Sequence, residues 1–151
     1  MSIIQDPTGF FNSLKEEKNS LYAFVEILKK EENSLVHGNF EDIDYLSSDK
    51  LRLIEELVSF DTQRNQYLIS QGCTPDGPGM TTWIEERQSL KSEAQVLWEE
   101  LLKVARIAQQ LNHTNGIIIS THLQHNQRAF TALQSAAGNI SLYGSNGQAF
   151  I

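Results

Sequence analysis

Two histidines in the last third of the chain, His122 and His125, have a spacing that could bind a metal ion. On a helix, residues three apart lie about one turn apart, so both imidazoles could reach the same ion. A zinc enzyme would add a carboxylate beside them, as the HExxH pattern does. The sequence contains no HExxH, and nothing in it places a carboxylate next to this pair. A solvated helix face is therefore the favoured interpretation, and we predict no metal site.

Paired glutamates are the second set of residues with chemical potential. Di-metal centres in helical bundles need inward-facing Glu-x-x-His motifs, and none occurs here. The single cysteine, Cys73, has no basic neighbour that would activate its thiol, and no glycine-rich phosphate loop with its lysine is present. We therefore predict that the protein is not an enzyme and binds no cofactor. The glutamate pairs are Glu16-Glu17, Glu31-Glu32, Glu55-Glu56 and Glu99-Glu100.

Composition narrows the class of partner. A chain of 151 residues with 40% hydrophobic residues can form one domain, 1–151, with a modest core. The longest aliphatic run is residues 117–119, and the first ten residues lack the pattern of a signal peptide, so we expect a cytoplasmic protein without membrane insertion. A net charge of −7 argues against binding nucleic acid or an anionic membrane surface. The expected partner is another protein.

Leucines at heptad spacing predict a first helix over about residues 8–37, which His37-Gly38 ends. Asn39 is expected to cap a second helix over residues 39–71 with its side chain, with Asp42 three places on. The apolar residues expected on the core faces are Phe10, Leu14, Leu21, Phe24, Leu28 and Leu35 in the first helix, and Phe40, Ile43, Leu46, Leu53, Leu57, Phe60 and Leu68 in the second.

The cluster GCTPDGPGM predicts a flexible loop over residues 72–81. Thr82 and Glu85 then form a capping box that opens a third helix over residues 82–114. Trp83 and Trp98 are expected to pack in the core rather than form a site. The apolar positions of the third helix alternate in steps of four and three: Leu90, Ala94, Leu97, Leu101, Val104, Ala108 and Leu111.

Beyond Asn115-Gly116 the apolar stripe changes phase, which gives residues 115–137 an adhesive face of their own before a flexible tail, 138–151. Two alternatives stay open. Either the chain folds back near Asn115 as a fourth helix, or the distal half projects. The expected class is all-α, an antiparallel up-and-down bundle of three long helices, or four with the fold-back. The new stripe is Ile119, Leu123, Phe130, Leu133, Ala137 and Ile140, interrupted at Asn126.

Short motifs in a fixed order occupy the last third of the chain: Trp98, Leu111-Asn112, Asn115-Gly116, Asn126-Gln127, Leu142-Tyr143-Gly144 and Gly147-Gln148. Together with residues 34–57, including Gly38 and Lys50, they resemble the FlgN family. This family comprises flagellar type III export chaperones for the hook-associated proteins, which join hook to filament. One departure is Ser145-Asn146, where an Ala-Asp pair is expected inside the Tyr-Gly turn.

The resemblance implies two binding sites. Tyr143, with Gly144 and Gly147, would dock on the cytoplasmic domain of the flagellar export gate, and the export ATPase complex is a further candidate partner. The alternatives are that Tyr143 packs back on the bundle, that the distal stripe is ordinary core, or that the protein is a structural coiled coil that self-associates through this stripe. The residues expected to accept the C-terminal amphipathic helix of a hook-associated protein are Ile118, Ile119, Leu123, Asn126, Phe130 and Leu133.

Overall fold

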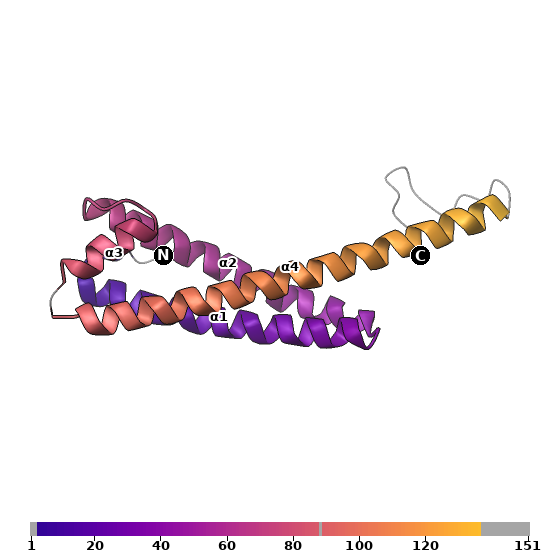
Figure 1. Cartoon of the computed structure of the whole chain (residues 1–151), viewed down its shortest axis with the longest axis horizontal. Coiled ribbons are helices and arrows are strands. Elements are labelled where there is room, and N and C mark those ends of the chain that lie inside the picture. Colours follow the sequence, from indigo (N-terminus) through magenta and orange to yellow (C-terminus); the bar gives the residue numbers. More distant parts are fainter. Residues whose placement is uncertain (1–2, 88, 137–151) are drawn as a thin grey trace. The chain divides into compact units, whose positions relative to one another are not determined.

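The computed structural model describes residues 3–87 and 89–136, and in these ranges it contains four α-helices and no strand (Figure 1). The helices are α1 (Pro7–Val36), α2 (Phe40–Ser70), α3 (Gly77–Glu85) and α4 (Lys91–Ala136). The predicted all-α class is confirmed. The chain divides into two compact units, Met1–Asn112 and His113–Ile151, which are described separately below.

Helix α1 is defined by local signals at both ends. The side chain of Asp6 accepts a hydrogen bond from the amide of Gly9 at 2.6 Å, and Pro7 occupies the first turn, where its missing N–H leaves no bond unmade. At the other end Gly38 adopts φ 70°, a conformation that glycine reaches without steric cost. The amide of Asn39 then bonds the carbonyl of Ser34 at 2.8 Å, which turns the chain into α2.

The predicted capping box at the start of α2 is wrong. Asn39 does occupy the N-cap position, but its side chain makes no capping hydrogen bond. Its backbone carbonyl instead accepts from the amide of Asp42 at 3.2 Å. The glycine turn before it already fixes the entry angle of the helix, so the start of α2 depends on backbone bonds rather than on an Asx cap.

The predicted loop over residues 72–81 is wrong in its second half, because α3 begins at Gly77. The carboxylate of Asp76 accepts from the amide of Gly79 at 2.9 Å and from the hydroxyl of Thr74 at 2.5 Å. Proline and glycine read as a loop in sequence, yet Pro78 lies in the first turn of a capped helix, where proline is tolerated. Thr82 does not open a helix; it lies inside α3, and its hydroxyl donates to the carbonyl of Pro78 at 3.0 Å.

The expectation that the third helix begins at residue 82 and that the chain may fold back near Asn115 is also corrected. The last helix begins at Lys91, and α4 then continues without a break through Asn115 and Gly116 to Ala136. Asparagine and glycine each lower helix stability by no more than about 1 kcal/mol relative to alanine. That penalty is too small by itself to end a helix of 46 residues.

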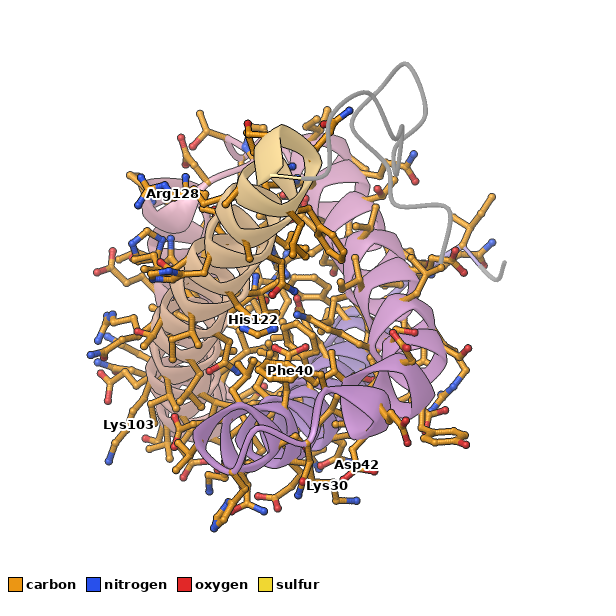
Figure 2. All side chains as sticks on the ribbon, turned by 90° about the vertical axis from the view of Figure 1, so that its right-hand side faces the viewer. Lys30, Phe40, Asp42, Lys103, His122 and Arg128 are labelled. Carbon is orange, nitrogen blue, oxygen red and sulfur yellow. The ribbon has the colours of Figure 1, made fainter. Side chains whose placement is uncertain are left out.

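The core of the first unit lies between α1, α2, α3 and the part of α4 that precedes Asn112. Helix α2 returns antiparallel to α1, and α4 starts at the same end as α1 and runs in the same direction (Figure 1). The Nζ of Lys18 in α1 lies 2.9 Å from a carboxylate oxygen of Glu100 in α4. Lys30 and Lys103 point outward from this unit (Figure 2). The largest buried hydrophobic side chains of the core are Trp83, Phe10, Leu14, Leu28, Leu68 and Met80.

Three aromatic rings join α1, α2 and α3 at one end of this unit. Phe10 stacks on Tyr67 with ring centroids 4.3 Å apart. The rings of Trp83 and Phe10 meet edge to face, with centroids 4.7 Å apart. Aromatic pairs in these geometries stabilise a fold beyond the area they bury. Trp83 is fully buried, as the sequence predicted, and it belongs to α3.

Candidate functional site

The predicted binding stripe lies on one face of the distal half of α4. At 3.6 residues per turn, Ile119, Leu123, Asn126, Phe130 and Leu133 fall within an arc of about 80°. Ile118 lies about 100° from Ile119 around the helix, on the adjoining side. A continuous helix therefore presents these apolar residues in a row, at alternating steps of four and three.

Exposure of this row is high for apolar side chains. Leu123 is 56% exposed and Leu133 57%, whereas Ile119 and Phe130 are partly buried. Asn126 is exposed, and its side-chain amide lies 3.4 Å from Nε2 of His122. Large side chains in a closed core are nearly fully covered. The row therefore has the character of a surface that still has apolar area to bury.

Charge in this part of the second unit is unusual for the chain. Residues 113–136 contain no aspartate or glutamate, and Arg128 is their one lysine or arginine. The chain as a whole is acidic, with a net charge of −7. The apolar row is thus bordered by uncharged polar residues and His122, and Arg128 lies on the opposite side of the helix. This setting suits recognition of another helix rather than chemistry on a small molecule.

His122 and His125 differ in their surroundings on α4. His122 is partly buried beside Asn126, and His125 is exposed. Among the residues that the structure describes, no group of three histidine, cysteine, aspartate or glutamate side chains is arranged to hold a metal ion. Cys73 is a free, partly covered thiol packed against the core.

The predicted gate-docking residues Tyr143, Gly144 and Gly147 lie outside the described residues. The same holds for Ala137 and Ile140, the last two positions of the predicted stripe. The expected flexible tail, 138–151, lies there as well. These residues remain predictions from the sequence.

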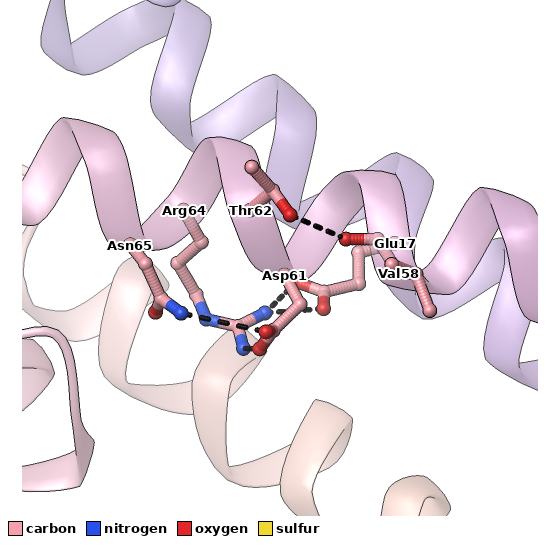
Figure 3. A network of polar contacts seen from close by, with 6 residues as sticks. All are labelled: Glu17, Val58, Asp61, Thr62, Arg64 and Asn65. Atoms are coloured by element: carbon pink, nitrogen blue, oxygen red, sulfur yellow. Dashed lines mark hydrogen bonds and ion pairs between the residues drawn. The ribbon is translucent and has the colours of Figure 1, made fainter.

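A network of ion pairs joins α1 and α2 in the first unit (Figure 3). The guanidinium of Arg64 in α2 donates to both carboxylate oxygens of Glu17 in α1, one of them at 2.6 Å, and to Asp61 at 2.5 Å. Burial raises the pKa of the Glu17 carboxyl, and the charge of Arg64 offsets part of that rise. The same guanidinium also lies over the ring of Trp98 in α4. Glu17 is buried and Arg64 is largely covered, whereas the Asp61 side chain is 57% exposed. The network holds helices together and does not form a reactive site.

Lys50, one of the residues that carry the family resemblance, has a structural role as well. Its Nζ lies 3.1 Å from both carboxylate oxygens of Glu31, which is buried in α1. This ion pair joins two residues that are 19 positions apart in sequence, and it holds α2 against α1. The ion pair accounts for a lysine at position 50 through the stability of the fold, with no role in binding a partner.

Sequence reasoning missed an exposed apolar row on α2. The prediction placed Phe40, Ile43, Leu46 and others toward the core, but Phe40 is 37% exposed. A second row was overlooked, because a sequence cannot show which of two apolar faces is covered. The sequence feature that could have revealed this row is the spacing of its apolar residues, which follow one another after three, four and eleven positions. Each of these spacings is close to a whole number of helical turns. The row, called the α2 stripe below, consists of Leu51, Ile54, Val58 and Ile69, with 58%, 37%, 61% and 59% exposure.

No helix in the described part of the chain is long and apolar enough to span a bilayer.

A helical bundle whose last helix carries an exposed apolar row has the architecture of a protein-binding module. The sequence matches the family described as FlgN protein over residues 7–149, nearly its whole length. The chain therefore belongs to the FlgN family, the flagellar export chaperones, and the resemblance noted in its sequence is confirmed. This is a chaperone family rather than an enzyme family. No individual curated protein and no solved structure gives a significant match.

Proposed function

We propose that this chaperone acts in the cytoplasm, where it binds the C-terminal amphipathic helix of a hook-associated protein through the distal half of α4. The observation that carries the proposal is the row of Ile119, Leu123, Phe130 and Leu133, which lies on one helix face and leaves two leucines more than half exposed. Apolar residues at steps of three and four are how one helix recognises another. By covering this helix, the chaperone keeps the client from premature assembly.

The expected affinity is moderate. Covering the exposed parts of Leu123 and Leu133 contributes about 1–1.5 kcal/mol each, while immobilising the partner costs about 4 kcal/mol or more. A few such anchors support reversible binding rather than a permanent complex. Reversibility is what a delivery chaperone needs, because the client must leave before export.

Delivery is the second part of the proposal. Tyr143, with Gly144 and Gly147, docks the loaded chaperone on the cytoplasmic domain of the export gate. Support comes from the order Leu142-Tyr143-Gly144 followed by Gly147-Gln148 within the family match. A tyrosine followed directly by glycine offers a rigid contact with a polar tip.

Isothermal titration with the C-terminal helical fragment of a hook-filament junction protein tests client capture. Leu123→Asp is expected to weaken binding at least tenfold, because it places a charge in an apolar contact. Ile117→Asp is the matched control. Ile117 is 53% exposed in the same part of α4 but lies on the opposite side from the row, so binding should persist. Equal loss in both variants, or in neither, would refute the assignment of the row.

Pull-down with the isolated cytoplasmic domain of the gate tests delivery. Tyr143→Ala should abolish capture of the chaperone by the gate and leave the titration with client unchanged. Loss of both activities would show that Tyr143 belongs to the client site instead.

A further inference from the structure

The apolar row on the distal half of α4 has one polar member, and that residue lies at its middle. Asn126 comes three residues after Leu123 and four before Phe130, and the row from Ile119 to Leu133 extends about 21 Å along the helix axis. About 10 Å of apolar surface therefore lies on each side of a single carboxamide.

Apolar contacts alone leave the position of a bound helix along this row undetermined. The row repeats steps of four and three, so a partner helix that slides by seven residues meets apolar side chains again. In helix pairs of this kind, charges that border the seam help to select one register. Residues 113–136 offer no such charges, because they contain no aspartate or glutamate and Arg128 lies on the opposite side of the helix. Within the row, Asn126 is the residue that distinguishes one register from another.

The carboxamide of Asn126 is accessible and only partly engaged. Its side chain is exposed, and Nδ2 lies 3.4 Å from Nε2 of His122, one turn earlier on the helix. A carboxamide can donate two hydrogen bonds and accept two. Within the described part of the chain the side-chain oxygen of Asn126 accepts none, so this oxygen and one N–H are available to a partner. Asn115 precedes the row on the same side of the helix, but it is fully buried.

A helix that docks on the row would bury this carboxamide. A leucine or isoleucine opposite Asn126 would leave its polar atoms without hydrogen bonds, which weakens a complex. A polar side chain opposite, such as asparagine, glutamine or serine, would satisfy them. A single asparagine in an otherwise apolar seam fixes the register of a coiled coil in this way, at a cost in stability.

We propose that Asn126 determines the specificity of the client site, and that the client helix carries one polar side chain on its apolar face, which pairs with Asn126. The inference rests on the proposed function, because it concerns the helix that the same row binds. The pairing selects one register and disfavours helices whose bound face is wholly apolar.

A double-mutant cycle tests the pairing. The full chain is titrated calorimetrically with the C-terminal helical fragment of a hook-filament junction protein, in which each polar side chain of the apolar face is changed to leucine in turn. Asn126→Leu should weaken binding of the unaltered fragment about tenfold, because the polar group of the client is left unpaired. One leucine variant of the fragment should restore this loss with Asn126→Leu and should itself bind the wild type about tenfold more weakly.

Gln124→Leu is the matched control. Gln124 is exposed in the same part of α4 but lies about 140° from Ile119 around the helix, so the variant adds the same side chain away from the row. Its affinity for each fragment should equal that of the wild type. Circular dichroism verifies that both variants keep their helical content.

Cross-linking measures the register directly. A photo-reactive amino acid in place of Gln127, which is exposed beside the row, should mark one segment of the client in the wild type. With Asn126→Leu added, it should mark segments seven residues apart. A residue that only supported the helix would leave the cross-linked segment unchanged.

The outcomes separate this inference from the proposed function. Unchanged or tighter binding by Asn126→Leu, a loss that no fragment variant restores, or an unchanged cross-link would overturn the role of Asn126 and leave client capture intact. A wild-type chain that does not bind the unaltered fragment would reject the proposed function, and this inference with it.

Discussion

The guanidinium carbon of Arg64 in α2 lies 5.5 Å from the centre of the Trp98 ring in α4. The same guanidinium pairs with Glu17 of α1, so one side chain contacts all three long helices of the first unit. Arginine is suited to this position, because its planar head can stack on a ring and donate to a carboxylate at once. The bundle on which the binding surfaces are built depends on this contact.

Removing Arg64 should destabilise the protein strongly. Arg64→Ala leaves the carboxylate of Glu17 buried without its cation, and breaking such a pair costs about 3–5 kcal/mol. The control is Arg52→Ala, which removes an exposed pair with Glu56 four residues away and should cost less than about 1 kcal/mol. Urea unfolding measures both. Similar losses in the two variants would show that the buried network does not stabilise the bundle.

The same carboxyl should give stability a pH dependence. Because the folded pKa of Glu17 is raised, the folded state binds its proton more tightly than the unfolded state does. Its contribution to stability is therefore fully present below the ordinary pKa of 4.5 and is lost as pH rises through the folded value. Glu17→Gln removes this titration. The free energy of unfolding of the wild type should fall relative to that of Glu17→Gln as pH rises from about 4 to 7, and a constant difference would contradict the raised pKa.

Gly79 in α3 should tolerate no side chain. A Cβ at this position would lie 1.6 Å from the backbone carbonyl oxygen of Thr74, so the α2–α3 turn would have to move. We expect Gly79→Ala to lower the free energy of unfolding by about 2 kcal/mol or more. Gly77→Ala serves for comparison, since a Cβ there meets nothing within 4 Å, and it should be close to neutral. Thermal unfolding of the two variants decides the matter, and a neutral Gly79→Ala would disprove the close approach.

Gly116 should accept alanine with a gain in stability. It lies inside α4, and a Cβ there meets no atom within 4 Å. Alanine stabilises a helix interior by about 1 kcal/mol relative to glycine. Gly116→Ala should therefore increase the helical signal and slow amide exchange in the residues around it. A loss of helicity would mean that the chain needs a flexible point at this position.

The sequence predicted the parts of the fold that depend on local pattern. Heptad leucines placed the core face of α1, where Leu14, Leu21, Leu28 and Leu35 are all buried. Proline and glycine near Gly77 concealed α3, because the cap that makes them helical is a contact of Asp76 with Thr74 and Gly79. Composition alone does not distinguish a capped first turn from a loop.

The two exposed apolar rows were predictable to different degrees. Periodicity found the row on α4, because a change of phase after Asn115 separates it from the core stripe. The α2 stripe was missed since Leu51, Ile54 and Val58 lie beside a second apolar face that is covered. Which face is covered depends on how α1 and α4 pack around α2, and that information is not local. The salt-bridge partners of Arg64 and Lys50 were missed for the same reason.

Hydrogen–deuterium exchange of the full chain, with and without the C-terminal helix of a hook-associated protein, tests the central claim most directly. We expect the client to slow exchange within residues 115–136, centred on Leu123 and Phe130, by at least tenfold. Exchange in the core of α1 should stay unchanged, because the bundle is already formed. Protection confined to α1 and the start of α4, with residues 115–136 unaffected by a bound client, would contradict the assignment of the distal half of α4 as the client site.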